Sequence, residues 1–374
     1  MKKKILHIVS FNIPFPANYG GVIDVFYKIK ALHNQGINII LHAFEYGRGK
    51  SPELEKYCSQ VHYYHRSLSP IKQLSVLPFI VKTRNVNTLL QNLKKDNYPI
   101  LFEGLHTCYF LNHPALVKRK KYIRMHNVEW QYYAHLAKME SNILKKTYFK
   151  LESEKLRSFE NKIENVDGIL AISKVDEQYF KRKYPSVSTH HIPAFHPNEK
   201  VEIKEGRGDY ILFHGDLSVK DNEQAAVFLL EKIMQSVDYQ LIIAGLNPSE
   251  KLKALILKTK NAKLKANVSN EQMEILIKNA HVNILLSFQS AGMKLKLLNA
   301  LFKGRFCVVN DFMVRNTGLE DLCLVGKTAE DFQKILSDIF QKEFSQNEIL
   351  ERKERLEIDF SNQKIANEIK WIIF

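Results

Sequence analysis

Short runs of apolar residues alternate with amphipathic stretches along the first half of the chain. The apolar runs predict buried strands, and the stretches with helical spacing predict helices between them. The predicted strands are 5–10, 37–44, 61–64, 100–104, 122–126 and 168–172, and the predicted helices are 21–34, 86–95, 128–138 and 143–163. Strands that alternate with helices are typical of α/β domains with parallel sheets.

The second half of the chain repeats this rhythm after a polar stretch at 196–209. The predicted strands are 210–214, 241–244, 264–268, 282–287 and 306–310, and the predicted helices are 222–237, 249–258, 271–279, 294–302, 328–342 and 362–373. We therefore expect α/β domains at 1–195 and 196–360, and a terminal helix at 361–374 that returns to the N-terminal domain. Two Rossmann-like, doubly wound domains would place ligands at the carboxyl ends of their strands, facing an interdomain cleft.

Composition narrows the class of protein. The 374 residues are 45% hydrophobic and 25% charged, which excludes a disordered or low-complexity chain. No apolar run is long enough to span a membrane. The four cysteines form no CxxC pair, so we expect reduced thiols and a cytoplasmic protein.

The net positive charge of the chain comes entirely from its first half. Residues 1–195 hold 30 Lys and Arg against 15 Asp and Glu, whereas 196–374 hold 25 of each. A basic half favours an anionic partner, such as a phosphate-bearing substrate, a membrane surface or a nucleic acid. Nucleic acid ranks last, because no aromatic-basic or DNA-reading motif accompanies the charge. The basic segment 67–95 either lies at an anionic membrane surface or forms two helices packed on its domain.

Polar residues and glycines follow several predicted strands of the first half. Gly20 and Gly21 open a helix after the first strand, where free N–H groups suit a phosphate or a sugar. Arg124, His126, Asn127 and Glu129 cluster after the fifth strand. Arg124 and His126 share one strand face, and Asn127 is placed to cap the next helix.

The second half offers a clearer anion site. Lys294 and Lys296 stand in the first turn of a predicted helix, where the helix dipole disfavours cations unless an anion is bound. Gly215 follows the strand 210–214 and allows close approach of a ligand. Asn222 either caps the next helix or contacts that ligand.

Taken in order, these motifs resemble the GT-B glycosyltransferases of the group 1 (family four) superfamily over nearly the whole chain. The first half carries the resemblance through Asn18-Tyr-Gly20-Gly21, RMHNVE at 124–129 and AISKVD at 171–176. The second half adds GDLSVKDN at 215–222 and GMKLKLLNAL at 292–301.

The resemblance implies a nucleotide-sugar donor on the second domain and an acceptor on the first. By it, His126 and Lys294 are the catalytic candidates. The implied donor-binding residues are Gly20, Gly21, Gly215, Ser218, Gly245, Gly292, Met293, Lys296 and Asn299, and the implied acceptor-side residues are Asn18, Arg124, Asn127 and Glu129.

The resemblance also implies sugar transfer with retention and without a divalent cation or other cofactor, which agrees with the lack of a D-x-D motif. The expected acceptor is a saccharide or a lipid-linked sugar in cell-surface polysaccharide synthesis. We accordingly expect a cytoplasmic enzyme, peripheral on the inner membrane, whose partners include an anionic membrane surface and no nucleic acid.

Three positions depart from the family pattern. Asn299 stands where relatives carry the glutamate that holds the ribose, Gln289 stands near an earlier acidic position, and Asp216 replaces an arginine. A neutral amide accepts hydrogen bonds less strongly than a carboxylate. The alternative interpretation is therefore a catalytically weak GT-B protein that binds a nucleotide-sugar or a partner transferase.

Overall fold

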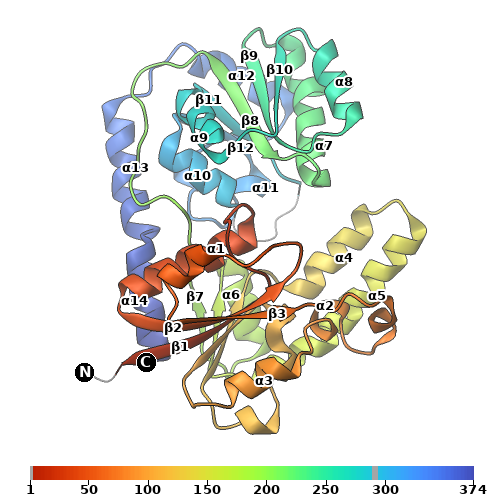
Figure 1. The fold of residues 1–374 in the computed structure, drawn as a ribbon. Coiled ribbons are helices and arrows are strands. Elements are labelled where there is room, and N and C mark those ends of the chain that lie inside the picture. Colours follow the sequence, from red (N-terminus) through yellow and green to blue (C-terminus); the bar gives the residue numbers. More distant parts are fainter. Residues whose placement is uncertain (1–2, 289–293) are drawn as a thin grey trace. The chain divides into compact units, whose positions relative to one another are not determined.

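The computed structural model describes residues 3–288 and 294–374, which fall into two compact units. Unit 1 contains residues 3–197 together with the C-terminal segment Asn362–Phe374, and unit 2 contains the described residues from Asn198 to Ser361. Each unit is a parallel sheet with helices on its faces, as expected for a Rossmann-like domain (Figure 1).

The sheet of unit 1 has seven strands in the order β3-β2-β1-β4-β5-β6-β7, all parallel. Their bounds are β1 Lys4–Ser10, β2 Ile37–Glu45, β3 Gln60–His65, β4 Ile100–Glu103, β5 Lys121–Met125, β6 Gly168–Ala171 and β7 Thr189–His191. The helices of unit 1 are α1 Gly20–Asn34, α2 Phe79–Lys82, α3 Asn87–Leu93, α4 Glu129–Met139, α5 Ile143–Glu160, α6 Lys174–Lys183 and α14 Asn362–Ile373, with a 3₁₀ turn η2 at Pro70–Leu74.

The sheet of unit 2 has six parallel strands in the order β10-β9-β8-β11-β12-β13. Its strands are β8 Tyr210–Asp216, β9 Gln240–Leu246, β10 Ala262–Ala266, β11 Val282–Leu285, β12 Phe306–Asn310 and β13 Leu324–Gly326. Its helices are α7 Lys220–Phe228, α8 Glu250–Lys258, α9 Asn270–Asn279, α10 Leu295–Lys303, α11 Asp311–Val314, α12 Ala329–Ile339 and α13 Gln346–Asp359.

The last helix packs on the first. Ile365, Ala366, Ile369 and Ile373 form an apolar stripe on α14 that is buried in the same core as Val25, Ile29 and Leu32 of α1. The phenol of Tyr122 donates a hydrogen bond to the carbonyl of Ile372 (3.1 Å). The chain therefore begins and ends in the same unit (Figure 1).

Most predicted elements are present, and the differences are in element ends, short strands and polar segments. The helix predicted at 222–237 begins two residues earlier, at Lys220, and its end is a π turn followed by a 3₁₀ turn. Short edge strands β7 and β13 and the polar helix α13 lacked a clear apolar pattern. The segment 67–95 forms only the turn η2 and two short helices.

Each sheet has one point where the strand order reverses. In unit 1 this point lies between β1 and β4, and in unit 2 it lies between β8 and β11. The loops that leave such neighbouring strands diverge to opposite faces of the sheet and open a crevice, where open α/β sheets bind ligands. The residues that follow these four strands are therefore the first place to look for chemistry.

Candidate active site

A buried network of charges lies at the reversal point of unit 1. The ammonium of Lys28 lies 3.0 Å from Asp24 Oδ2, one helical turn away on α1, and 2.8 Å from a carboxylate oxygen of Glu103 at the end of β4. Arg124 of β5 forms two hydrogen bonds to the Asp24 carboxylate, of 3.1 and 2.8 Å. All four side chains have no exposed surface.

The network pairs two acidic side chains, Asp24 and Glu103, with two basic ones, Lys28 and Arg124. Burial alone would raise the pKa of Asp24, but Arg124 and Lys28 outweigh it and hold that pKa far below its ordinary value. The backbone N–H of Phe195 also donates to this carboxylate (2.9 Å). Each charge is thus paired and hydrogen-bonded, which is the condition under which charges survive burial.

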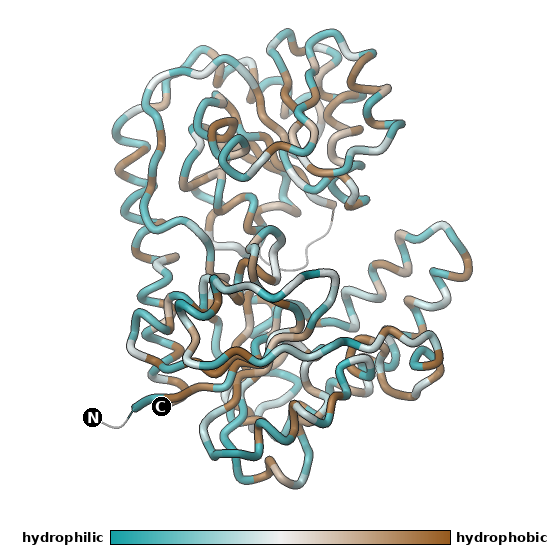
Figure 2. Tube along the Cα trace, viewed as in Figure 1, coloured by the Kyte–Doolittle hydropathy of each residue, from teal (hydrophilic) through white to brown (hydrophobic). Residues whose placement is uncertain are grey.

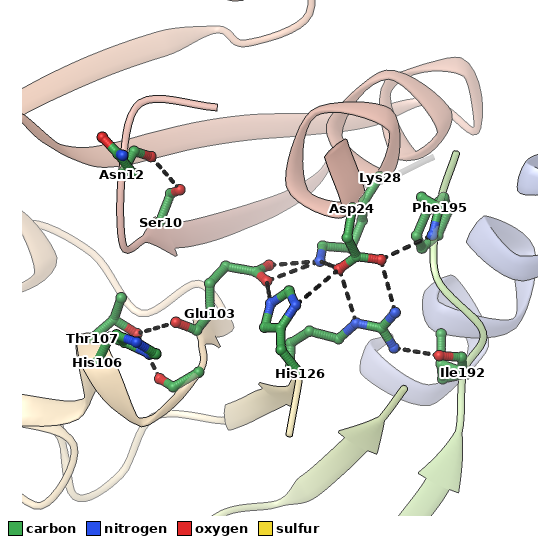
Figure 3. Close-up of polar contacts among 12 residues, drawn as sticks. Ser10, Asn12, Asp24, Lys28, Glu103, His106, Thr107, His126, Ile192 and Phe195 are labelled. Atoms are coloured by element: carbon green, nitrogen blue, oxygen red, sulfur yellow. Dashed lines mark hydrogen bonds and ion pairs between the residues drawn. The ribbon is translucent and has the colours of Figure 1, made fainter. Parts of the chain in front are cut away.

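His126 lies at the edge of this network. Its Nε2 is 3.1 Å from Glu103 Oε2, and its Nδ1 is 3.9 Å from Asp24 Oδ2 (Figure 3). The side chain of His126 is 12% exposed. The ring meets Phe11 edge-on, with ring centroids 5.6 Å apart. The histidine is therefore oriented by a carboxylate on one side and an aromatic ring on another, and it keeps a face that a ligand can reach.

Asp24, Glu103 and His126 have the chemistry of a metal-ligand set. Their ligand atoms lie within 4.8 Å of one another. However, the ammonium of Lys28 is already seated between the two carboxylates, and a divalent cation there would be repelled by it and by Arg124. The cluster fits an internal ion-pair network better than a metal site.

Gly21, near the start of α1, packs against an aromatic ring. A Cβ on Gly21 would come within 2.7 Å of Cζ of Phe11, the same ring that contacts His126. Asn12 organises the loop, because its side chain bonds both the phenol of Tyr19 (2.9 Å) and the N–H of Ile13. Asn18 and Gly20 are exposed on this loop, where a ligand can reach them.

The acceptor-side candidates differ in their burial and in their contacts. Arg124 is fully buried, and its nitrogens bond Asp24 and the carbonyls of Ile192 and Pro193, so its side chain holds the fold together rather than facing an acceptor. Asn127 does not cap α4, because Val128 is the N-cap residue and no side chain caps that end. Its expected capping role was wrong.

Glu129 is also buried, with 3% exposure. Burial, with further repulsion from Glu160 and Asp176, raises the pKa of this carboxyl to about 8. A carboxyl of that kind is mostly protonated at neutral pH, so it serves as a neutral hydrogen-bonding group. It is the first residue of α4, and its side chain has almost no surface on which an acceptor could bind.

In unit 2, two lysines converge on the reversal point between β8 and β11. Lys294 is the N-cap residue of α10 and donates to Ser287 Oγ (3.2 Å), while Lys296, in the first turn, donates to Asn222 Oδ1 (2.8 Å). Asp221 ties the loop after β11 by accepting from Ser287 Oγ (2.9 Å) and from the N–H of Phe288 (2.8 Å). Among the described residues, Asp221 is the carboxylate that acts on both amines.

The negative charge of Asp221 does not balance the two positive charges of Lys294 and Lys296. Burial lowers the pKa of each lysine to about 8, and Asp221 only partly opposes that shift. His214, buried on β8, is kept neutral by burial and by Lys296, which lower its pKa to about 3. Two desolvated amines at the start of a helix, with one nearby acid, form an electropositive site suited to a phosphate.

The remaining predicted donor residues of unit 2 have mixed roles. Asn222 does not cap α7, which begins at Lys220 after Val219, so that expectation was wrong; its amide instead donates to Asp216 O (2.8 Å) and accepts from Lys296. Gly215 and Gly245 lie in paired strands, and a Cβ on Gly245 would stand 1.8 Å from the Gly215 carbonyl oxygen. Close strand packing therefore explains Gly245.

Two further donor candidates are Ser218, which follows β8, and Asn299, which lies on α10. Ser218 is exposed, and both its N–H and its hydroxyl donate to Asp216 Oδ1 (3.0 and 2.7 Å). Asn299 Oδ1, on α10, is buried and has no hydrogen-bond partner within the described part of the chain. A buried acceptor without a donor costs free energy, which a ligand hydroxyl would relieve. Gly292, Met293 and Gln289 fall outside the described residues.

The sequence did not predict four charged residues of the two polar clusters: Asp24, Lys28 and Glu103 in unit 1, and Asp221 in unit 2. Asp24 and Lys28 had one available signal, because an acid and a base four residues apart interrupt the apolar stripe of a helix. Glu103 ends an apolar strand, which marks it as a strand-end candidate. Asp221 was part of a quoted motif, but nothing in the sequence indicated that it bonds the loop after β11.

The chain thus consists of two parallel α/β units, each with a polar cluster at the point where its strand order reverses. Residues 208–342 match the family described as Glycosyl transferases group 1. The chain is 30% identical over 332 residues to an uncharacterized 44.6 kDa protein in the cps region of Klebsiella pneumoniae, and the alignment covers 83% of this chain and 84% of that protein.

Solved structures of low sequence identity share the whole fold. S. aureus TarM, solved with fondaparinux, alpha-GlcNAc-glycerol and UDP, has a TM-score of 0.66 at 12% identity, with 100% of both chains covered. An alpha,alpha-trehalose-phosphate synthase (UDP-forming) from Burkholderia xenovorans, solved with glucose-6-phosphate, has a TM-score of 0.67 at 9% identity, with 99% of both chains covered. The chain belongs to the group 1 glycosyltransferases and has their GT-B fold.

Proposed function

We propose that this glycosyltransferase moves a sugar from a nucleotide-diphosphate sugar to a saccharide or lipid-linked acceptor in the synthesis of a cell-surface polysaccharide. The observation that carries the proposal is the pair Lys294 and Lys296, desolvated at the start of α10 beside one carboxylate. The cps-region relative supports the polysaccharide context. The UDP in the TarM structure supports a nucleotide-diphosphate donor.

The chemistry of the proposed donor site follows from its electrostatics. Cleavage of the donor leaves a nucleoside diphosphate, on which negative charge grows in the transition state. Two ammonium groups placed in advance stabilise that charge without reorganisation, and bound diphosphate in turn raises the pKa of both lysines again. With two such cations in place, the departing diphosphate needs no divalent ion, and we propose metal-independent transfer with retention.

In unit 1, His126 is proposed to contact the transferred sugar. Glu103 fixes the ring through Nε2, so the exposed edge of the imidazole presents a defined hydrogen-bonding group. Of the exposed residues between β1 and α1, we assign Gly20 to the same sugar and Asn18 to the acceptor. Unit 1 would accordingly hold the acceptor and unit 2 the donor.

Asn299 favours a second candidate function, a GT-B protein that binds the nucleotide-sugar but turns it over poorly. An amide replaces the glutamate that the family uses there, and its buried Oδ1 has no hydrogen-bond donor among residues 3–288 and 294–374. A ribose hydroxyl would satisfy that oxygen, but more weakly than it would satisfy a carboxylate. This candidate keeps the donor site and differs from the first in turnover alone.

A thermal-shift screen against UDP, GDP, ADP and CMP, each with and without magnesium, tests the donor site. A ligand that binds only the folded protein stabilises it by about 2.7 kcal/mol at a hundredfold excess over Kd. We expect one diphosphate to raise the Tm by several degrees, independently of magnesium. The rise should vanish in Lys296→Ala and persist in Lys251→Ala, which removes an exposed lysine of α8.

Turnover then separates the two candidates. We expect the matching nucleotide-sugar to release its nucleoside diphosphate in the presence of a saccharide acceptor. Binding without release in the wild type, together with release in Asn299→Glu, would select the catalytically weak GT-B protein. A screen in which no nucleotide shifts the Tm of the wild type would refute the donor site itself.

A further inference from the structure

Five large aliphatic side chains of unit 1 stand in solvent on two segments. Ile71, Leu74 and Val76, on η2 and the loop after it, are 73%, 85% and 89% exposed. Ile143 and Leu144, at the first turn of α5, are 78% and 82% exposed. We call these five residues the apolar rim. Single exposed aliphatic residues are ordinary, but five on neighbouring segments indicate an interaction surface.

The two segments are joined through the middle of α5. The N–H of Phe79 donates to the carboxylate of Glu152 (2.6 Å), and the ammonium of Lys155 donates to the carbonyl of Gln73 (2.8 Å). Leu151, next to Glu152, is 59% exposed and lies two turns along α5 from Ile143. Figure 2 shows apolar colour on the α4–α5 hairpin and on the loop beside α5.

The rim is surrounded by positive charge. The segments 67–77 and 138–151 contain five lysines, namely Lys72, Lys138, Lys145, Lys146 and Lys150, against a single acid, Glu140. Lys145, Lys146 and Lys150 are exposed, and along α5 they lie between the exposed Leu144 and the exposed Leu151. Apolar side chains for the acyl boundary, with lysines for the headgroups, are the combination that lies in a membrane interface.

We propose that the apolar rim and its lysines dock unit 1 on an anionic lipid bilayer. A second copy of the chain is a poorer fit, because it would bring a like-charged lysine cluster against this one. No described helix is long and apolar enough to cross a membrane, so the contact is with the surface. The rim supplies apolar insertion, and the lysines select anionic headgroups. This inference does not depend on sugar transfer.

Co-sedimentation with vesicles tests the proposal. We expect the protein to bind phosphatidylcholine vesicles that contain phosphatidylglycerol, and to bind pure phosphatidylcholine at least tenfold more weakly. A variant with Lys145→Gln, Lys146→Gln and Lys150→Gln should lose about a hundredfold in affinity for the anionic vesicles. A variant with Leu74→Ser, Val76→Ser, Ile143→Ser and Leu144→Ser should lose at least tenfold even at low salt.

A matched control comes from unit 2. Leu257 is 87% exposed on α8, and Lys251 and Lys258 lie on the same helix. Leu257→Ser with Lys251→Gln and Lys258→Gln should bind like the wild type. The Tm of every variant shows that it is folded.

The proposal fails if the wild type does not bind anionic vesicles, or if the rim variants bind as well as the control. It also fails if the rim variants change only the sedimentation velocity of the protein without lipid, because the rim would then be an interface between copies.

Discussion

The imidazole Nε2 of His126 lies 3.1 Å from Oε2 of Glu103, a carboxylate that has no exposed surface and also pairs with Lys28. A carboxylate in this position fixes which ring nitrogen carries the proton and where the ring points. Glu103 is therefore a positioning residue for the histidine that we assign to the transferred sugar.

Replacement of Glu103 should reduce turnover through His126. We expect Glu103→Gln to lower kcat by at least tenfold, because the amide holds the imidazole without the charge that selects one tautomer. Lys28→Met is the matched control, since it breaks the same ion pair but leaves the carboxylate beside His126. Steady-state kinetics at a temperature where both variants are folded should show a smaller loss for Lys28→Met; equal losses would mean that the ion pair, not the histidine contact, matters.

Arg124 should prove important for stability. Arg124→Met leaves the buried Asp24 carboxylate paired only with Lys28, and breaking a buried pair costs about 3–5 kcal/mol. Denaturant unfolding measures that loss. The exposed Arg182→Met on α6 should change the free energy of unfolding by less than about 0.5 kcal/mol. A loss no larger than this for Arg124→Met would contradict the network described here.

Buried histidines should make the protein sensitive to acid. His7 Nδ1 lies 2.8 Å from Nε2 of His42, whose Nδ1 lies 2.8 Å from the phenol oxygen of Tyr64. Burial lowers the pKa of His7 to about 4, and it also holds the pKa of His42 well below the ordinary value.

The unfolded chain therefore takes up protons near pH 6.5 that the folded chain refuses until the pH is much lower. Stability is full above about pH 6.5 and falls as the pH drops toward 4, by an amount on the order of a few kcal/mol. His42→Gln should flatten this slope in thermal unfolding curves, whereas His65→Gln, at the exposed end of β3, should leave it unchanged. An unchanged slope in His42→Gln would exclude this histidine as its source.

Glu129 should act in the opposite direction. Burial and the nearby acids raise the pKa of its carboxyl to about 8, so the folded chain holds a proton that the unfolded chain releases near pH 4.5. The stabilisation is complete below about pH 4.5 and is lost as the pH rises through 8. Glu129→Gln mimics the protonated acid, so we expect its Tm relative to the wild type to be higher at pH 8 than at pH 5. The same difference at both values would contradict a protonated carboxyl.

Much of the fold was predictable because burial leaves a periodic trace in the sequence. The apolar runs at 210–214 and 306–310 could only be strands of a buried sheet, and the stripe at 362–373 predicted α14 with the bounds that the structure has. Edge strands such as Thr189–His191 left no trace, because only three residues pair there and histidine is not apolar. Helix starts are also hard to place: Asn127 and Asn222 have side chains typical of cap residues, but the N-cap residues of α4 and α7 are Val128 and Val219.

The sequence by itself determined the two α/β repeats, the family and the lysine pair after β11, because each depends on residues that are close together along the chain. The tertiary structure decided which groups meet. Asp24, Glu103 and Arg124 come from α1, β4 and β5, and only the strand order that sets β4 beside β1 brings them together. Their burial, and hence their pairing, depends on packing from all sides, and packing between distant segments has no local signature in the sequence.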